Sequence, residues 1–302
     1  MSPRHRHRHG STGSNKIRYH GLATDPHTDG QAGESLADLL LGYGEQLLEM
    51  PGPLEAELSA ASLVTLQRQR GLPQQMCDLT ITSVLTEDLA GHPCDQSAAV
   101  VRAIIAVGSA PQRSAATSVL GEITASGFYP PAWAAVIGRP APVAAWRRYD
   151  VFGDTETIAI EFAYGPDRHV LLVRTDQFRP PAATQITIDD DVDAVTASLR
   201  DSTDPLSRWE DLDLAAARAR LEPALARGDR GRHPSLPADS LARLPVARTR
   251  MRRLPRTPAV APDVAFDADD RRSAVTAFLS SPATQDATDP ATVQFWAEVL
   301  TG

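Results

Sequence analysis

The sequence predicts an α+β protein: an N-terminal helical bundle, a central antiparallel sheet of three to four strands, and further C-terminal helices. Apolar residues recur at helical spacing from residue 34 to about residue 127. Segments rich in Val, Ile, Phe and Tyr then follow at hairpin spacing, before helical periodicity returns. An uninterrupted group of strands between two groups of helices indicates α+β rather than alternating α/β architecture.

The chain begins with a polar segment, residues 1–32, that is rich in His, Arg and Gly and has few large apolar side chains. This composition predicts a disordered basic arm. The run RHRHRHG at residues 4–10 resembles a purification tag, and it also suits metal or phosphate-backbone binding. The arm therefore carries two hypotheses, a tag-like extension and a histidine-rich metal-binding segment.

The helical bundle is predicted over residues 33–130. Ser35 is a candidate N-cap, Pro53 suits the first position of a helix, and Gly71 suits the position just after a helix end. The expected helices occupy residues 34–50, 53–71, 77–91, 95–109 and 111–127.

The sheet region is predicted over residues 131–227, beginning with a short helix around Trp133. The expected strands are 143–151, 157–164, 168–175 and 184–188, and the expected later helices are 191–200, 213–227, 240–254, 271–280 and 290–300. Pro and Arg interrupt residues 228–268, which predicts a loosely packed linker with at most one short helix. Residues 269–302 then form the C-terminal helices.

Composition excludes several chemistries. Lys16 is the only lysine, so Schiff-base enzymes, ordinary P-loop NTPases and protein kinases are poor interpretations. Cys77 and Cys94 are too few for a disulfide framework or a four-cysteine zinc site. The net charge of −8 argues against a surface that binds nucleic acid all over. The start of the chain lacks an apolar signal segment, which predicts a cytoplasmic protein, and no cofactor is predicted.

The most patterned stretch, residues 157–178, holds Glu161, His169 and Asp176. A three-residue turn at Gly165–Asp167 would pair Tyr164 with Arg168, placing Glu161 and His169 on one face as diagonal neighbours. Asp176 would then lie on the opposite face. A glutamate beside a histidine can perform acid–base chemistry. The pattern favours an ordinary hairpin, and a register shift of one residue would separate the pair.

Two shorter motifs have structural explanations. Acidic residues at 189, 191 and 193 resemble the opening of a calcium loop, but Ala194 and Arg200 stand where that loop needs glycine and glutamate. An acidic helix start explains them better. Cys94 precedes a helix, where a thiol can become reactive, and a structural thiol is the favoured interpretation.

The segment ARTRMRRLPR at residues 247–256 concentrates the candidate partner-binding residues Arg248, Arg250, Arg252 and Arg253. Guanidinium groups bind phosphate and carboxylate bidentately. A solvated linker pairing with the protein's own acids is the simpler interpretation. The leading hypothesis for function is a non-catalytic interaction or regulatory protein that contacts an acidic protein partner or nucleic acid through these arginines. The alternative is an acid–base or metal-dependent hydrolase using Glu161 and His169 with Asp154 or Asp176.

The stretch PAWAAVIGRPAPVAAWRRYDVFGD, followed by IEFAYG and HVLLVRTD, resembles a group of uncharacterised proteins from high-GC actinobacteria. RSAVTAFLSSPAT at 272–284 resembles a later segment of that group. The resemblance implies no activity and no functional residues. Its members continue beyond the point where this chain stops, which implies a further C-terminal portion. The matching positions are Trp133, Gly138, Pro142, Trp146, Asp150, Gly153, Asp154, Glu161, Phe162, His169 and Asp176.

Overall fold

The computed structural model describes residues 36–177, 181–201, 204, 206–227, 236–256 and 268–280. The elements within these ranges belong to one compact unit. The predicted basic arm at 1–32 and the predicted helix at 290–300 lie outside the described residues. None of the helices in the described ranges combines the length and the apolar character needed to cross a bilayer.

The N-terminal half is helical, as predicted. Its helices are α1 (Leu36–Leu48), α2 (Pro53–Gln69), α3 (Gln74–Val84) with a π-helical turn (Leu85–Leu89), α4 (Asp95–Val107) and α5 (Ala110–Ala125). Local sequence explains several ends. Pro53 opens α2, and Ser109 and Gln112 form a reciprocal capping box at the start of α5. Cys94 is the N-cap of α4, with its sulfur accepting from the backbone N–H of Ser97.

These helices enclose an apolar core centred on α4, which packs against α1, α2 and α5. A short 3-10 helix (Ala132–Ala135) closes it, and the Trp133 indole N–H donates to the Leu47 carbonyl over 3.1 Å. The core is built largely from small and branched side chains, including Leu40, Ala60, Val64, Leu85, Ala99, Val101, Ile104 and Ile123.

The sheet contains five antiparallel strands in the order β4-β3-β2-β1-β5. The protein therefore has the predicted α+β fold class. The fifth strand, which joins the edge beside β1, was not predicted. The strands are β1 (Ala141–Asp150), β2 (Thr155–Tyr164), β3 (Asp167–Asp176), β4 (Ala182–Asp189) and β5 (Ser207–Asp211).

The turn between β2 and β3 corrects the predicted register. Tyr164 pairs with Asp167, so the turn has two residues, Gly165 and Pro166, instead of three. Gly165 has a φ of 63°, which suits the first central position of a tight hairpin turn where glycine is favoured. The shorter turn shifts every cross-strand pair by one residue relative to the prediction.

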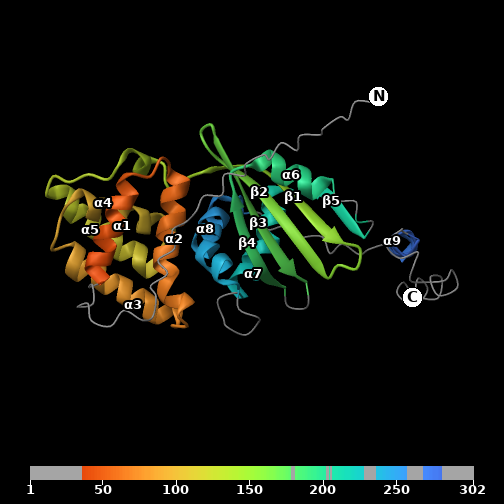
Figure 1. Ribbon diagram of the computed structural model, residues 1–302, viewed down its shortest axis with the longest axis horizontal. Helices are drawn as coiled ribbons and strands as arrows, with labels where there is room; N and C mark the ends of the chain where they lie inside the picture. Colours follow the sequence, from red (N-terminus) through yellow and green to blue (C-terminus); the bar gives the residue numbers. More distant parts are fainter. Residues whose placement is uncertain are drawn as a thin grey trace, which may run out of the picture. The chain divides into compact units, whose positions relative to one another are not determined.

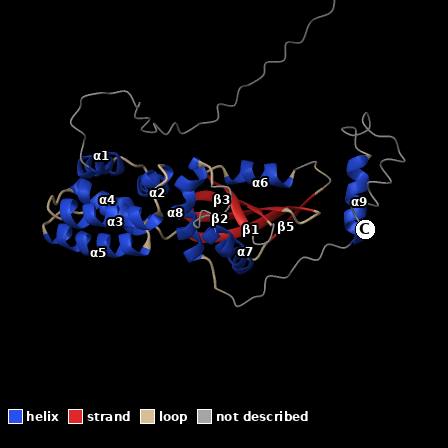
Figure 2. Ribbon diagram, turned by 90° about the horizontal axis from the view of Figure 1, so that it is seen from below, coloured by secondary structure: helices blue, strands red, loops and turns tan. Residues whose placement is uncertain are grey.

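The sheet lies between helices on both faces (Figure 2). One face, with Ile158, Phe162 and Leu171, packs against α7 (Leu214–Arg227) and α8 (Ala238–Arg253). The other face packs Ala159 and Val170 against α6 (Val192–Arg200). Asp191 caps α6 by accepting from the Ala194 N–H, which confirms the acidic helix start.

Helix α8 matches the helix predicted at 240–254, and its close packing differs from the loosely packed linker predicted over residues 228–268. It has 16 residues and continues through Pro245. It packs against both α2 and β4, so it stands between the helical half and the sheet (Figure 1). Leu244, Ala247 and Met251 are buried in the sheet core, while Val246 joins the helical core. A last described helix, α9 (Ala268–Leu279), matches the helix predicted at 271–280.

Candidate functional site

The predicted acid–base pair is not assembled in the structure. His169 pairs with Phe162, whereas Glu161 pairs with Val170, so the two side chains lie on opposite faces of the sheet. Glu161 accepts a hydrogen bond of 2.7 Å from the Arg168 Nε. Asp176 lies at the far end of β3, paired with Thr155. The reason is the two-residue turn, since a shift of one residue moves a side chain to the other face.

His169 is a buried structural residue. Its ring stacks between Phe162 and Tyr164, with both centroids 5.9 Å away, and its Nε2 accepts from the Arg250 Nε over 3.0 Å. Burial, with the positive charge of Arg250, lowers the pKa of His169 to about 3. The imidazole therefore stays neutral at ordinary pH and acts as a hydrogen-bond acceptor.

Arg250 and Glu57 form a wholly buried ion pair between α8 and α2. The guanidinium Nη1 and Nη2 donate to Glu57 Oε1 and Oε2 over 3.0 and 2.6 Å, and both side chains are 0% exposed. Burial opposes the charge on Arg250, but the Glu57 carboxylate outweighs it and leaves the pKa of Arg250 raised. Arg250 is therefore buried inside the protein and not exposed to a partner, contrary to its predicted partner-binding role.

The same network reaches the chain segment before β1. The backbone N–H of Gly138 donates to Glu57 Oε1 over 3.1 Å and to the Tyr164 hydroxyl oxygen over 2.9 Å. Gly138 has a φ of 76° and lies close to α4, since a Cβ there would stand 3.2 Å from the Ala106 Cβ. Buried contacts therefore fix the backbone position from which the side chain of the neighbouring Arg139 extends.

The four predicted partner-binding arginines separate in the structure. Arg248 is half-buried on the side of α8 near Arg68 and Asp78, where burial first, and then Arg68, lower its pKa to about 10. Arg250 is buried. Arg252 and Arg253 are exposed at the end of α8, where both line a hollow.

This hollow, here called the arginine pocket, has a volume of about 320 Å³. Four chain segments form it: α4, α5, the segment before β1, and the C-terminal end of α8. Five of its ten lining residues are arginines, and none is acidic. The lining residues are Arg102, Ile105, Ala106, Arg113, Ile137, Gly138, Arg139, Thr249, Arg252 and Arg253.

Three of the arginines are held by neutral oxygen atoms. Arg102 Nε donates to the Ala134 carbonyl over 2.8 Å, and Arg113 Nη1 donates to the Gly108 carbonyl over 2.8 Å. Arg252 Nη2 donates to the Thr249 hydroxyl over 2.7 Å and to the Ala106 carbonyl over 3.3 Å. These contacts fix the guanidinium groups through neutral oxygens, with no carboxylate of the described ranges bonded to them.

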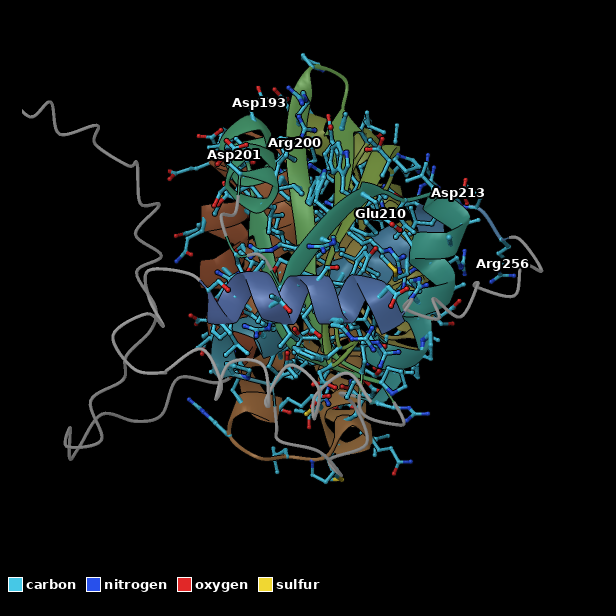
Figure 3. The ribbon with its side chains drawn as sticks, turned by 90° about the vertical axis from the view of Figure 1, so that its right-hand side faces the viewer. Asp193, Arg200, Asp201, Glu210, Asp213 and Arg256 are labelled. Atoms are coloured by element: carbon cyan, nitrogen blue, oxygen red, sulfur yellow. The ribbon has the colours of Figure 1, made fainter. Side chains whose placement is uncertain are left out.

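The other two, Arg139 and Arg253, are exposed and make no side-chain hydrogen bond or ion pair to the described part of the chain. Within the same ranges, no carboxylate forms an ion pair with any of the five arginines. Another exposed cation, Arg200, has acids near it: Figure 3 shows it on a side that also carries Asp193, Asp201 and Glu210.

Crowding of the arginines affects their ionisation. Burial and then the charge of Arg113 lower the pKa of Arg252 to about 10, against a smaller opposing effect of Glu57. Burial and then Arg139 lower the pKa of Arg102. Because guanidinium groups are positively charged in proteins, the pocket concentrates charges that repel one another.

A second hollow, of about 490 Å³, lies at the start of α2, the β2–β3 turn and the start of α6. His169 and Tyr164 reach its wall, but Glu161, Asp154 and Asp176 do not line it. Its acids are Glu55, Asp167, Asp190, Asp191 and Asp193. Among the described residues, no three His, Cys, Asp or Glu side chains gather in a way that could hold a metal ion.

Sequence reasoning missed Arg102, Arg113 and Arg139 because they are distant along the chain. Weak signals exist for two of them. Arg102 interrupts the apolar run AAVVRAIIAV, and Arg113 lies near the start of α5, where the helix dipole disfavours a positive charge. Only the fold brings these side chains together with Arg252 and Arg253.

Comparison of the chain with family models, curated proteins and solved structures finds no match. The resemblance to an actinobacterial protein group therefore stays a prediction.

Proposed function

We propose that this chain is a non-catalytic binding protein that contacts an acidic partner through the arginine pocket. The observation that carries the proposal is the set of five guanidinium groups around one hollow that has no acidic lining residue. In a chain of net charge −8, five cations gathered around one hollow mark a place where an anion is favoured.

A purely structural role accounts for only part of the pocket. Arginines near a helix C-terminus cap carbonyl oxygens, which explains Arg113 and Arg252 beside the end of α4. It does not explain Arg139 and Arg253, which contact none of these carbonyls. Nor does it require five positive charges to face the same hollow.

Binding is favoured over catalysis by the fate of the predicted catalytic residues. Glu161 is bonded to Arg168 on one face of the sheet, and His169 is buried on the other face beside Arg250. A protein partner is favoured over single-stranded nucleic acid because no aromatic side chain lines the pocket to stack on bases.

The test measures binding of the full chain to a fluorescent polyglutamate peptide and to a single-stranded oligonucleotide by fluorescence anisotropy. We expect binding of the peptide that weakens as NaCl rises from about 50 to about 200 mM, because salt screens exposed charges. The double variant Arg139→Gln/Arg253→Gln should bind about tenfold more weakly, at roughly 0.7 kcal/mol for each exposed ionic contact.

The matched control is Arg70→Gln/Arg256→Gln. Both residues are exposed arginines outside the pocket lining, and Arg256 follows the last residue of α8, Arg253; Figure 3 labels Arg256 near the edge of its view. The control should bind within about twofold of the unaltered chain, a difference of less than about 0.5 kcal/mol. Absence of binding, or equal losses in both variants, would contradict the proposal. Tighter binding of the oligonucleotide than of the peptide would replace the protein partner with nucleic acid.

A further inference from the structure

We propose that the arginine pocket recognises a dianionic phosphoryl group, carried at the end of a compact molecule or on a phosphorylated side chain. This inference rests on the proposed function and names the chemical group that the anionic partner presents. It follows from the charge of the pocket, the donors that its arginines leave unused within the described residues, and the size and chemistry of its lining.

Charge density is the first argument. Five guanidinium groups from four segments surround about 320 Å³, with no carboxylate in the lining. A phosphodiester or a single carboxylate brings one negative charge. A phosphomonoester brings about −1.5 to −2 at neutral pH, together with three strongly accepting oxygens. Of these groups, the phosphomonoester therefore compensates the positive charge of the pocket best, because it carries the most negative charge in a compact volume.

The donors are the second argument. Arg102 uses only Nε, and Arg113 only Nη1, in hydrogen bonds within the described residues. The remaining N–H groups of these two half-buried guanidinium groups stay available on a scaffold fixed by backbone carbonyls. Planar guanidinium forks bind phosphate oxygens bidentately. Because the forks come from α4, α5, α8 and the segment before β1, they suit a tetrahedral group better than a planar carboxylate.

The lining is the third argument. A volume of about 320 Å³ lies at the small end of the range for small-molecule pockets. Its apolar contacts come only from Ile105, Ala106 and Ile137, and no aromatic ring offers a stacking surface for a nucleobase. This favours a short phosphorylated group over a nucleotide chain.

The backbone does not contribute a donor at Gly138. Its N–H is already directed at Glu57 and Tyr164, behind the pocket. Recognition must therefore come from the guanidinium groups, and removal of arginines should abolish it.

The experiment titrates the full chain with four probes by isothermal titration calorimetry at pH 7.5. Methyl phosphate and a phosphoserine peptide carry the dianion, dimethyl phosphate carries one charge, and malonate is a carboxylate dianion. We expect methyl phosphate to bind at least about tenfold more tightly than dimethyl phosphate and about fivefold more tightly than malonate. A phosphoserine peptide that binds more tightly than methyl phosphate identifies a modified protein as the source, and equal affinities identify a small molecule.

A pH series adds a second readout. The second pKa of a phosphomonoester is near 6, so affinity for methyl phosphate should rise about tenfold from pH 5 to pH 7.5. The titratable groups that line the pocket are five arginines, and Glu57 and Tyr164 lie behind Gly138. Dimethyl phosphate keeps a single negative charge from pH 5 to pH 7.5, so its affinity should change much less over this range. The rise therefore reports ionisation of the phosphate.

Arg139→Gln/Arg253→Gln should weaken methyl phosphate binding more than about tenfold, and Arg70→Gln/Arg256→Gln should leave it within about twofold. Arg253→Gln alone, at an exposed position, serves if the double variant does not fold. Dimethyl phosphate or malonate binding as tightly as methyl phosphate would overturn this inference while leaving the acidic-partner proposal intact. If the unaltered chain also fails to bind the polyglutamate peptide, both this inference and the acidic-partner proposal are overturned.

Discussion

Replacement of Glu57 by glutamine tests whether the buried ion pair between α2 and α8 holds the two halves of the described fold together. The change preserves the shape of the side chain and removes its charge. It leaves Arg250 charged in a site where both partners are 0% exposed. The new amide N–H2 would also face a guanidinium N–H across one of the two hydrogen bonds, which are 2.6 and 3.0 Å long.

The expected loss is about 3–5 kcal/mol in the free energy of unfolding, the usual cost of stranding one member of a buried pair. This is a large share of the roughly 5–15 kcal/mol that stabilises a typical domain. Urea unfolding followed by circular dichroism measures it, with an unchanged m-value as the sign of an unchanged two-state transition. The control is Asp193→Asn in the exposed Arg168–Asp193 pair, which should cost less than about 1 kcal/mol.

A double-mutant cycle separates the pair from its surroundings. Arg250→Met alone should also cost about 3–5 kcal/mol, because it leaves the Glu57 carboxylate buried without its cation. The double variant Glu57→Gln/Arg250→Met strands no charge. It should therefore lose at least about 2 kcal/mol less than the sum of the two single losses. Additive losses, or single losses below about 1 kcal/mol, would refute a tightly coupled buried pair.

Two further predictions concern residues next to this pair. The pKa of His169 is lowered to about 3 in the fold but is near 6.5 in the unfolded chain, so the unfolded state binds the extra proton between these values. Stability should therefore fall by about 2 kcal/mol from pH 8 to pH 5 through this group. His169→Gln keeps a hydrogen-bond acceptor for Arg250 and should remove that part of the pH dependence. The control His92→Gln, at an exposed position, should not remove it. Identical pH profiles for the two variants would show that His169 does not cause this pH dependence. Gly138→Ala should lower the free energy of unfolding by about 1–3 kcal/mol, because the φ of 76° is left-handed and the new Cβ would crowd Ala106. Thermal unfolding should show this loss of stability, and polyglutamate binding should weaken. A Gly138→Ala protein as stable as the unaltered chain would show that this backbone position is not constrained.

Much of the fold could be predicted from local pattern. Pro53 at the start of α2 and the acidic residues before α6 mark helix starts through capping chemistry that involves only near neighbours. The main strands follow from apolar and β-branched runs. Strand β5, with the sequence SRWED, escapes this reasoning because it is short and charged, and pairing with β1 places it in the sheet.

Helix α8 shows how burial overrides local composition. A helix is predicted at 240–254, but the prolines and arginines of residues 228–268 indicate that it lies in a loosely packed linker, since proline removes a backbone donor and charge disfavours burial. The fold instead buries Leu244 and Ala247 against the sheet and neutralises Arg250 with Glu57, a residue 193 positions earlier. No local pattern contains that partner.

The sequence by itself determined the α+β class, most helix starts, and the strand-turn-strand character of residues 157–176. These properties depend on residue type and short-range spacing. The tertiary structure alone decided that His169 faces Arg250 instead of Glu161, because the length of one turn sets the register of the whole hairpin. It also decided which arginines meet around one hollow, because electrostatic interaction depends on distance in space, and these arginines come from four segments that only folding brings together.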